Sequence, residues 1–398
     1  MVSAACDHAH MAQALRLAER GLHTTQPNPR VGCVLAYGDK TVGEGWHQRA
    51  GGPHAEIFAL AKAAERARGA TAYVTLEPCG LHGRTPPCAD ALIAAGIARV
   101  VVASEDPFQH AGSAIERMRA AGIAVETGLM REAARELNRG FFSRIERGRP
   151  WVRVKLAMSL DGRTALANRE SKWITGAAAR VDVQRWRARS SAILTGMGTV
   201  MADDPSLTVR ALESLSRAAR GEGEGDAHAV RAPGTSPRPS PLPGGERKEA
   251  ILSPLRVVLD RQLLTPRGAK VLDGDAPTLL LHASDARVVD DRFANAERAV
   301  VESSEHGLDL DHVLRLLAAR GMNEVQVEAG PTLCGALFAA GLVDELLLYV
   351  APVLLGDSAR PLLSLPVISE MSARWNLRQV DQRQVGEDIR LLLRANVT

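Results

Sequence analysis

The chain has 398 residues, of which 45% are hydrophobic and 24% are charged, and its formal net charge is +3. This composition is typical of globular domains, and the length predicts two or three of them. The small net charge argues against a dedicated nucleic-acid surface, which usually carries a strong basic excess. The sequence contains no long uncharged apolar run, and residues 1–10 lack the apolar core of a secretory signal, so we expect no membrane-spanning helix and no export.

The five cysteines are few and odd in number, which argues against a disulfide framework. We therefore expect a reducing, cytoplasmic location. We interpret Cys6, Cys33 and Cys334 as small core or surface residues rather than metal ligands.

The first part of the chain alternates between two hydrophobic patterns. Apolar residues at helical spacing predict helices at 8–20, 57–68, 89–95, 113–121 and 132–142. Short apolar runs predict strands at 31–36, 41–45, 71–76, 99–103 and 124–127. Strands alternating with helices predict an α/β layered domain, which we assign to residues 1–147.

One stretch of this domain carries the residue types of a catalytic metal site. His54 precedes a predicted helix, Cys79 follows a predicted strand, and Cys88 precedes the next helix. One imidazole and two thiolates are good zinc ligands, and a catalytic zinc needs three protein ligands with a fourth position open for water. Glu56 lies two residues after His54, where its carboxylate can take a proton from that water and pass it to a leaving amine.

Two other interpretations of these cysteines stay open at this point. They are unrelated buried residues, or they belong to a structural zinc site in which His82 supplies the fourth ligand. A structural site does not require Glu56. Zinc-dependent nucleobase deaminases use His-x-Glu followed by Pro-Cys-x-x-Cys, whereas here eight residues separate Cys79 from Cys88.

Polar residues gather in the short loops beside the candidate ligands. Each alone is typical of an ordinary loop residue, but as a group they suit the recognition of a polar ring and a phosphate. They are Asn28, His47, His82, Arg84 and Thr85.

The second part of the chain follows a predicted linker at 147–150 and again alternates strands with helices. Strands are expected at 151–157, 192–196, 255–260, 277–282, 323–328 and 389–394, and a long strand or a strand pair at 344–355. Helices are expected at 177–189 and 310–320. A loop rich in acidic and hydroxyl groups is expected at 199–210. We assign residues 148–398 to this second domain.

Residues 211–254 interrupt the pattern of the second domain. They contain Gly/Glu-rich and Pro/Ser-rich runs that cannot build a hydrophobic core, and the strand pattern resumes directly after them. We interpret the segment as a disordered insertion within the domain and not as a domain boundary.

A strand, Gly330 and a helix start at Pro331 follow one another near the end of the chain. Free backbone N–H groups and the helix dipole at such a junction favour a phosphate. The segment lacks the Gly-x-Gly-x-x-Gly fingerprint of dinucleotide-binding folds, and a plain packing turn would need the same small residues.

Eight segments in one order resemble the bifunctional deaminase/reductases of riboflavin biosynthesis, and the resemblance covers nearly the whole chain. The wide spacing of Cys79 and Cys88 is the form that this family uses. The segments are residues 27–32, 45–51, 54–56, 75–79, 82–88, 159–165, 202–205 and 328–333.

The resemblance implies an α/β fold with an N-terminal cytidine-deaminase-like three-layer domain and a C-terminal dihydrofolate-reductase-like domain. It implies two consecutive reactions. In the first, zinc held by His54, Cys79 and Cys88, with Glu56 moving the proton, removes the 2-amino group of a diaminopyrimidinone that carries phosphoribosylamine. In the second, NADPH reduces the ribosyl group of the resulting uracil to ribityl.

The resemblance also implies the binding residues of the reductase. Arg187 and Arg210 suit the substrate phosphate because a guanidinium can grip it bidentately, and Lys155 would orient the ribose. For NADPH the implied residues are Ala157, Trp173, Thr199, Asp203, Gly330, Pro331, Thr332, Leu333, Cys334, Gly335 and Ala336. For the substrate they are Ser171, Arg187, Leu207, Arg210 and Glu328.

The partner implied by the resemblance is a small phosphoribosylated pyrimidine, with no nucleic acid and no membrane, and the family suggests a homodimer or higher homo-oligomer. Two segments depart from the family pattern. Residues 106–112 are shorter than the usual loop and lack its second proline, so we assign them no substrate contact. The insertion directly follows Arg210 and could loosen it.

Two rival functions stay open on the sequence. A nucleic-acid base deaminase explains the first domain, but it favours the short Cys-x-x-Cys spacing and leaves the second domain unexplained. A non-catalytic zinc scaffold with a Pro-rich arm for partners would lose no reaction on Glu56→Ala.

Overall fold

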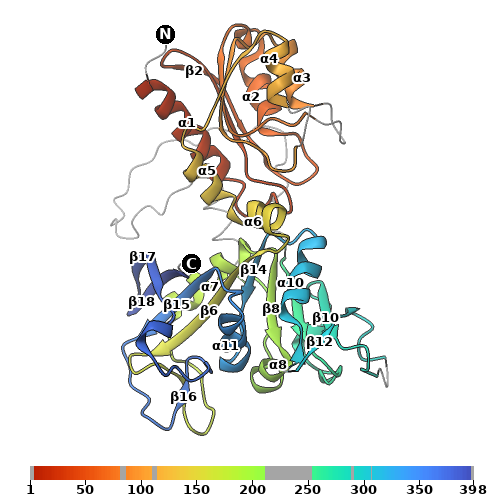
Figure 1. The fold of residues 1–398 in the computed structure, drawn as a ribbon, viewed down its shortest axis with the longest axis vertical. Helices are drawn as coiled ribbons and strands as arrows, with labels where there is room; N and C mark the ends of the chain where they lie inside the picture. Colours follow the sequence, from red (N-terminus) through yellow and green to blue (C-terminus); the bar gives the residue numbers. More distant parts are fainter. Residues whose placement is uncertain are drawn as a thin grey trace, which may run out of the picture.

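The computed structural model describes residues 4–80, 87–109, 114–210, 253–287, 291–305 and 307–395. They form two α/β domains, one above the other in Figure 1, with α6 (Arg139–Arg147) between them. Almost all of the predicted insertion lies outside the described residues. Within the described part of the chain, no helix is both long and apolar enough to span a membrane.

The N-terminal domain is built on a five-stranded sheet of order β2-β1-β3-β4-β5. β1 runs antiparallel to both of its neighbours, and β3, β4 and β5 are parallel. The strands are β1 (Gly32–Tyr37), β2 (Lys40–Trp46), β3 (Thr71–Leu76), β4 (Arg99–Ser104) and β5 (Ala124–Thr127).

Helices cover both faces of this sheet, as the three-layer expectation requires. Successive strand residues point to opposite faces, so Leu35 packs in the core under α2, α3 and α4, whereas Val34 packs in the core under α1 and α5. The helices are α1 (Ala4–Glu19), α2 (Ala55–Ala63), α3 (Cys88–Ala94), α4 (Ala114–Ala120) and α5 (Arg131–Leu137), with a 3-10 turn η1 (Ala64–Ala67).

The single helix predicted at 132–142 is wrong, because α5 and α6 are separate. Asn138 stands between them with non-helical angles of φ −110° and ψ 20°. Its side-chain amide donates to Arg30 O and accepts from Arg30 N, both at 2.8 Å. A side chain that pairs with another part of the backbone competes with helix continuation.

The C-terminal domain is built on a nine-stranded sheet of order β11-β10-β9-β8-β14-β6-β15-β18-β17, with β6 near its middle. All neighbours are parallel except at β18, which runs antiparallel to both of its partners. The strands are β6 (Trp151–Ser159), β8 (Ala192–Gly196), β9 (Leu255–Leu259), β10 (Thr278–His282), β11 (Glu297–Val300), β14 (Glu324–Val327), β15 (Glu345–Ala351), β17 (Leu377–Val385) and β18 (Asp388–Ala395).

Helices and short pairings complete this domain. Its helices are α7 (Ala177–Ala188), α8 (Met197–Asp203), α10 (Leu310–Ala319) and α11 (Pro331–Ala339), with 3-10 turns η2 (Lys270–Leu272) and η3 (Met371–Ala373). β7 (Arg163–Ala165) pairs with β16 (Arg360–Pro361), and β12 (Ser303–Ser304) pairs with β13 (Gly307–Leu308).

Two predictions for this domain are wrong. The loop expected at 199–210 begins inside a helix, α8, which ends only where Asp204 takes a left-handed φ of 42° before Pro205. The strand expected at 344–355 ends at Ala351. β17 was not predicted, because most of its residues are exposed and it has no continuous apolar run.

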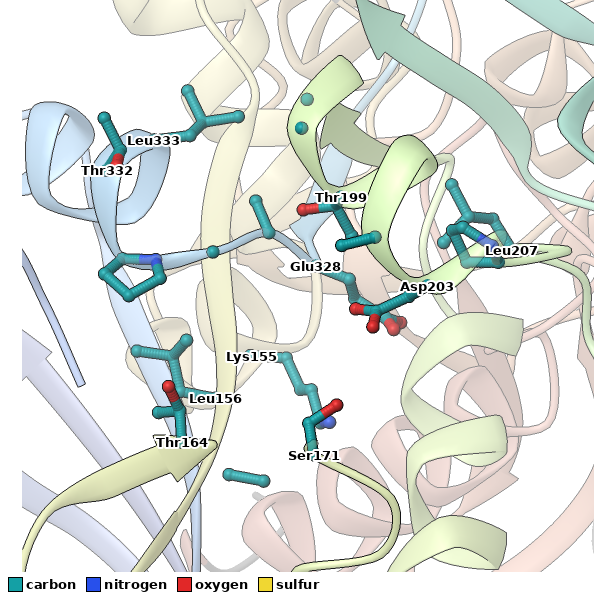
Figure 2. A pocket seen from close by; sticks show the side chains of 18 of the residues that line it. Lys155, Leu156, Thr164, Ser171, Thr199, Asp203, Leu207, Glu328, Thr332 and Leu333 are labelled. Carbon is teal, nitrogen blue, oxygen red and sulfur yellow. The ribbon is translucent and has the colours of Figure 1, made fainter. Parts of the chain in front are cut away.

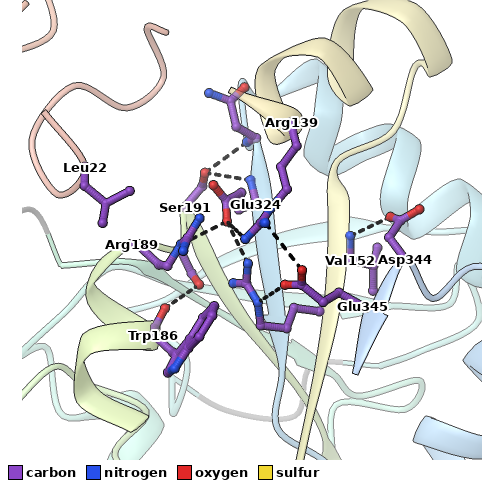
Figure 3. Close-up of polar contacts among 12 residues, drawn as sticks. Leu22, Arg139, Val152, Trp186, Arg189, Ser191, Glu324, Asp344 and Glu345 are labelled. Atoms are coloured by element: carbon purple, nitrogen blue, oxygen red, sulfur yellow. Dashed lines mark hydrogen bonds and ion pairs between the residues drawn. The ribbon is translucent and has the colours of Figure 1, made fainter. Parts of the chain in front are cut away.

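Buried charges join the two domains (Figure 3). Arg30 of the N-terminal domain donates to Glu324 on β14 at 3.0 Å, and Arg139 on α6 lies 3.4 Å from Glu345 on β15. Arg153 on β6 donates to both of these carboxylates, at 2.6 and 3.0 Å. The two carboxylate side chains are at most 1% exposed, so this charge cluster is part of the interior and fixes how the domains meet.

Candidate active sites

The structure brings together the three candidate zinc ligands, which come from three separate elements. His54 is the residue that caps the N-terminus of α2, Cys79 follows β3, and Cys88 is the first residue of α3. Their ligand atoms all lie within 4.8 Å of one another. The N-termini of α2 and α3 therefore both lie at the ligand group. The backbone N–H groups of a helix N-terminus stabilise a thiolate.

The spacing of these atoms fits a zinc ion. His54 Nδ1 lies 3.2 Å from Cys88 Sγ and 3.4 Å from Cys79 Sγ. Ligands at normal zinc bond lengths and tetrahedral angles lie about 3.5 Å apart. Hydrogen bonding from Cys88 and His54 lowers the pKa of the Cys79 thiol, which favours the thiolate that a metal requires. The same contact with Cys79 raises the pKa of the Cys88 thiol, as expected for two neighbouring sulfurs with no cation between them.

Glu56 lies beside these ligands in the first turn of α2 and is 2% exposed. Its Oε2 has no hydrogen-bond partner among the described residues. Burial raises the pKa of the carboxyl to about 7. A buried carboxylate oxygen without a partner, next to a three-ligand group, suits proton transfer and is not explained by a purely structural site.

Within the described ranges, the ligand group has no fourth His, Cys, Asp or Glu. His82, which the sequence analysis considered as a fourth ligand, lies outside the described residues, as do Arg84 and Thr85.

Two other predicted polar residues flank the site. His47 lies edge-on to the His54 ring, with ring centroids 5.4 Å apart, and Asn28 contacts His47 Nε2 at 3.1 Å. His47 Nδ1 contacts Pro53 O at 3.0 Å, which fixes the ring.

A separate cleft of about 2030 Å³ opens in the C-terminal domain. It lies at the carboxyl ends of β6, β8, β9 and β14 and at the N-terminus of α11, where parallel sheets place their ligands. Figure 2 shows the side chains of Lys155, Asp203 and Glu328 directed into it. A cleft of this size has room for a dinucleotide together with a substrate.

Most of the predicted reductase residues line this cleft. From the cofactor set these are Ala157, Trp173, Thr199, Asp203, Gly330, Pro331, Thr332, Leu333 and Ala336. From the substrate set they are Ser171, Arg187, Leu207, Arg210 and Glu328.

Cys334 and Gly335 do not line the cleft. Cys334 is fully buried in the core under α11, and its thiol donates to Ala329 O at 3.4 Å. Gly335 is packed so closely that a Cβ would lie 2.0 Å from Ser364 O. Their contribution is to the position of α11 and not to a direct side-chain contact.

The cleft contains a buried ion pair between Arg187 and Glu328. Arg187 Nε and Nη2 each donate to the Glu328 carboxylate at 2.7 Å, and Gln326 Nε2 donates to the same group at 2.8 Å. Burial alone would raise the pKa of Glu328, but the Arg187 guanidinium holds it at about 2. Burial lowers the pKa of the Lys155 ammonium, while the nearby Glu328 charge opposes this shift. Glu328 is therefore ionised at neutral pH.

The two arginines expected at the substrate phosphate differ in availability. The bidentate edge of Arg187 already faces Glu328, and its Nη1 also donates to Thr208 O at 2.9 Å. Arg210 is exposed and has a single side-chain contact within the described residues, from Nη2 to Ser206 Oγ at 3.2 Å. Of the two, Arg210 is the one whose guanidinium is free to turn toward an anion.

Some cleft residues were not predicted from the sequence. They include Thr164, Arg169, Arg180, Gln184 and Arg360. Arg180 lies over the Trp173 ring at 4.6 Å. Arg180, Gln184 and Arg187 are spaced so that they share one face of a predicted helix. This spacing could have predicted that the helix presents a polar face to the cleft.

Comparisons with known proteins match both domains. The family model described as the cytidine and deoxycytidylate deaminase zinc-binding region matches residues 4–104. The model described as the RibD C-terminal domain matches residues 150–391. The two matches cover the two domains in order.

Relatives match along the full chain. The riboflavin biosynthesis protein RibD of Escherichia coli (strain K12) is 44% identical over 392 residues, which is 97% of this chain and 99% of that protein. The solved structure of Acinetobacter baumannii RibD, form 1, has a TM-score of 0.84 at 40% identity and covers 99% of both chains.

A third relative carries both activities in its name. The deaminase/reductase structure from Thermotoga maritima has a TM-score of 0.78 at 29% identity and covers 98% of this chain and 99% of its own. Full-length matches of this kind argue against a nucleic-acid base deaminase and against a non-catalytic scaffold. The chain belongs to the RibD family, the bifunctional enzymes of riboflavin biosynthesis that join a zinc-dependent deaminase domain to an NADPH-dependent reductase domain.

Proposed function

We propose that residues 1–147 hydrolyse the 2-amino group of a diaminohydroxyphosphoribosylaminopyrimidine, and that residues 148–398 reduce the resulting 5-amino-6-(5-phosphoribosylamino)uracil with NADPH. The observation that carries this proposal is the pairing of two sites in separate domains. One has a three-ligand metal group beside a buried carboxylate whose Oε2 has no hydrogen-bond partner among the described residues, and the other is a ligand-sized cleft. The name of the Thermotoga maritima relative supports the two substrates.

In the deaminase site, we assign His54, Cys79 and Cys88 to the metal and Glu56 to proton transfer. Zinc, when bound, makes a water molecule nucleophilic near neutral pH. As the water oxygen bonds to the ring carbon and the C–N bond breaks, the Glu56 carboxylate would accept one proton of the water and pass it to the amino group, which leaves as ammonia. The other water proton ends on the ring nitrogen of the product. Burial raises the pKa of Glu56, which suits a group that both accepts and donates a proton.

In the reductase site, the lining residues bind and orient two ligands. NADPH, when bound, supplies the hydride. The first turn of α11, which follows Gly330, suits a phosphate of the cofactor. The backbone N–H groups of Thr332 and Leu333 have no acceptor within the helix, and Pro331 has no N–H to offer. Lys155 and Glu328 stand on the substrate side with opposite charges, where they hold ribose hydroxyl groups for the transfer, and Arg210 takes the substrate phosphate.

Replacing Glu328 with Gln is expected to lower NADPH oxidation about 100-fold, which is the effect of misplacing a substrate by about 1 Å. The uncharged amide leaves Arg187 and Lys155 without their counter-charge, so both side chains reorient. Steady-state assays with the deaminated substrate measure this loss. Ammonia release should stay at the wild-type rate, and Glu302→Gln, at an exposed carboxylate, is the matched control. Equal loss of both activities would contradict the assignment.

We propose that the enzyme is cytoplasmic and works as a homodimer or higher homo-oligomer through its C-terminal domain. Large apolar side chains are exposed on this domain, with Val367 98%, Met371 75% and Leu354 74% exposed. Such side chains are typical of surfaces that another copy covers. Sedimentation is expected to give at least twice the 42.6 kDa mass of one chain, and a monomer at micromolar concentration would contradict it.

A further inference from the structure

The two thiolate ligands are held by different kinds of structure. Cys88 begins α3, so the helix fixes its backbone. Cys79 lies in a segment after β3 that has no regular secondary structure. In a Cys-x-x-Cys motif both thiolates share one helix start, but here eight residues separate them. Cys79 therefore needs an anchor from elsewhere in the chain.

Part of that anchor comes from α3. Cys79 O accepts a hydrogen bond from Ala89 N at 3.2 Å, and Cys79 Sγ accepts one from Cys88 N at 3.2 Å. These contacts hold the thiolate against the helix start. They leave the peptide groups on either side of Cys79, the carbonyl of Pro78 and the N–H of Gly80, to be fixed by other residues.

One side chain holds both of these peptide groups. Gln109 Nε2 donates to Pro78 O at 3.0 Å, and Gly80 N donates to Gln109 Oε1 at 2.8 Å. The primary amide thus pairs with the backbone on both flanks of Cys79, as a neighbouring strand would. Only a group with a donor and an acceptor side by side can do this, so neither a carboxylate nor a hydroxyl replaces it.

Gln109 is itself held in place by the same part of the fold. Its backbone N donates to Asp106 O at 3.1 Å, and Asp106 N donates to the Glu77 carboxylate at 3.2 Å. The approach is close, since a Cβ at Gly80 would lie 3.1 Å from Gln109 Oε1. Gln109 and Glu77 therefore tie the segment after β4 to the ligand segment after β3.

We propose that Gln109 is a positioning residue that holds the zinc ligand Cys79, an inference that rests on the proposed deaminase function. It gives a role to residues 106–109 of the shortened segment, to which the sequence analysis assigned no substrate contact. Groups that orient metal ligands from behind typically contribute 10–100-fold to metal affinity or activity.

The test is the rate at which a chelator removes zinc from the full-length enzyme. Gln109→Ala is expected to release zinc about 10- to 100-fold faster than wild type. Gln109→Glu, which keeps the length but loses the donor to Pro78 O, should also release faster. Gln13→Ala removes an amide of α1 that donates to Glu44 on β2, and this variant should release zinc at the wild-type rate.

A second readout separates positioning from general loss of structure. Gln109→Ala should lower kcat for ammonia release, and NADPH oxidation by the same molecules should be unchanged. Unchanged zinc release in Gln109→Ala would overturn the inference, and so would equal loss of both activities. A wild-type enzyme that holds no zinc would contradict the proposed deaminase function. Zinc-loaded Gln109 variants that behave like wild type would contradict only the role of Gln109.

Discussion

Replacing Glu56 with Gln is expected to lower the rate of ammonia release by a factor of about 100 to 10,000, the usual contribution of a general acid–base group. The amide has nearly the shape of the carboxyl but can neither accept nor return the proton. Zinc content, measured by atomic absorption, should stay at one ion per chain, because His54, Cys79 and Cys88 are unchanged.

Two comparisons make this result specific. NADPH oxidation with the deaminated substrate should be equal in Glu56→Gln and wild type, since the reductase cleft lies in the other domain. Glu65→Gln, at an exposed carboxylate in the turn after α2, should retain both activities. Ammonia release at the wild-type rate in Glu56→Gln would remove this residue from the mechanism.

Replacing Glu324 with Gln is expected to cost about 3–5 kcal/mol of the free energy of unfolding, as when one partner of a buried ion pair is lost. Glu324 accepts from Arg30 and Arg153 at 3.0 Å, and Arg189 Nε lies 3.4 Å from it. The variant leaves these guanidinium groups buried without their shared counter-charge. Urea unfolding measures the loss.

A surface carboxylate of the same region provides the control for Glu324. Glu146 is 39% exposed and pairs with Arg135, so Glu146→Gln should cost less than about 1 kcal/mol. A loss below 1 kcal/mol in Glu324→Gln as well would contradict the view that the charge cluster fixes the domain interface.

The pH dependence of this difference follows from the pKa of Glu324. Burial alone would raise it, but the guanidinium groups of Arg189, Arg30, Arg139 and Arg153 hold it well below 4.5. The charged form is thus favoured by folding, and its contribution is present above pH 4.5 and is lost as the pH falls below it. Wild type and Glu324→Gln should therefore approach each other in stability under acid conditions.

The grouping of His54, Cys79 and Cys88 could be predicted from the sequence because each candidate ligand stands at an element boundary with a clear signal. His54 precedes a helical pattern, and Pro87 marks the helix start at Cys88. The interior role of Gln109 could not be predicted, since its partners Pro78 and Gly80 are about thirty residues away and the contact depends on how β3 and β4 pair.

Part of the charge cluster is visible in the sequence as polar residues that alternate with apolar ones in a predicted strand. Glu324 and Gln326 alternate along β14 and so share one face of a central strand, and Glu328 follows the strand in the same alternation. Buried acidic side chains need partners, but which arginines supply them depends on the packing of both domains. The strand thus begins at the domain interface, with Glu324, and leads into the reductase cleft, where Glu328 lies just after its end.

Helix α8 was missed for a local reason. Gly196 and Gly198 lower helix propensity at its start, and Pro205 follows its end, so the segment has the composition of a loop. Contact with β8 stabilises it in the fold, which is an effect of tertiary packing that no local pattern shows.

The central claim is that two separate sites on one chain act in sequence, and simultaneous measurement of ammonia release and NADPH oxidation tests it most directly. With the diaminopyrimidine substrate, the purified chain should release ammonia first and then oxidise NADPH in equal amount. A mixture of Glu56→Gln and Glu328→Gln should restore the complete sequence, because each variant keeps the site that the other lacks. NADPH oxidation without prior ammonia release, or a mixture no more active than either variant alone, would contradict the account.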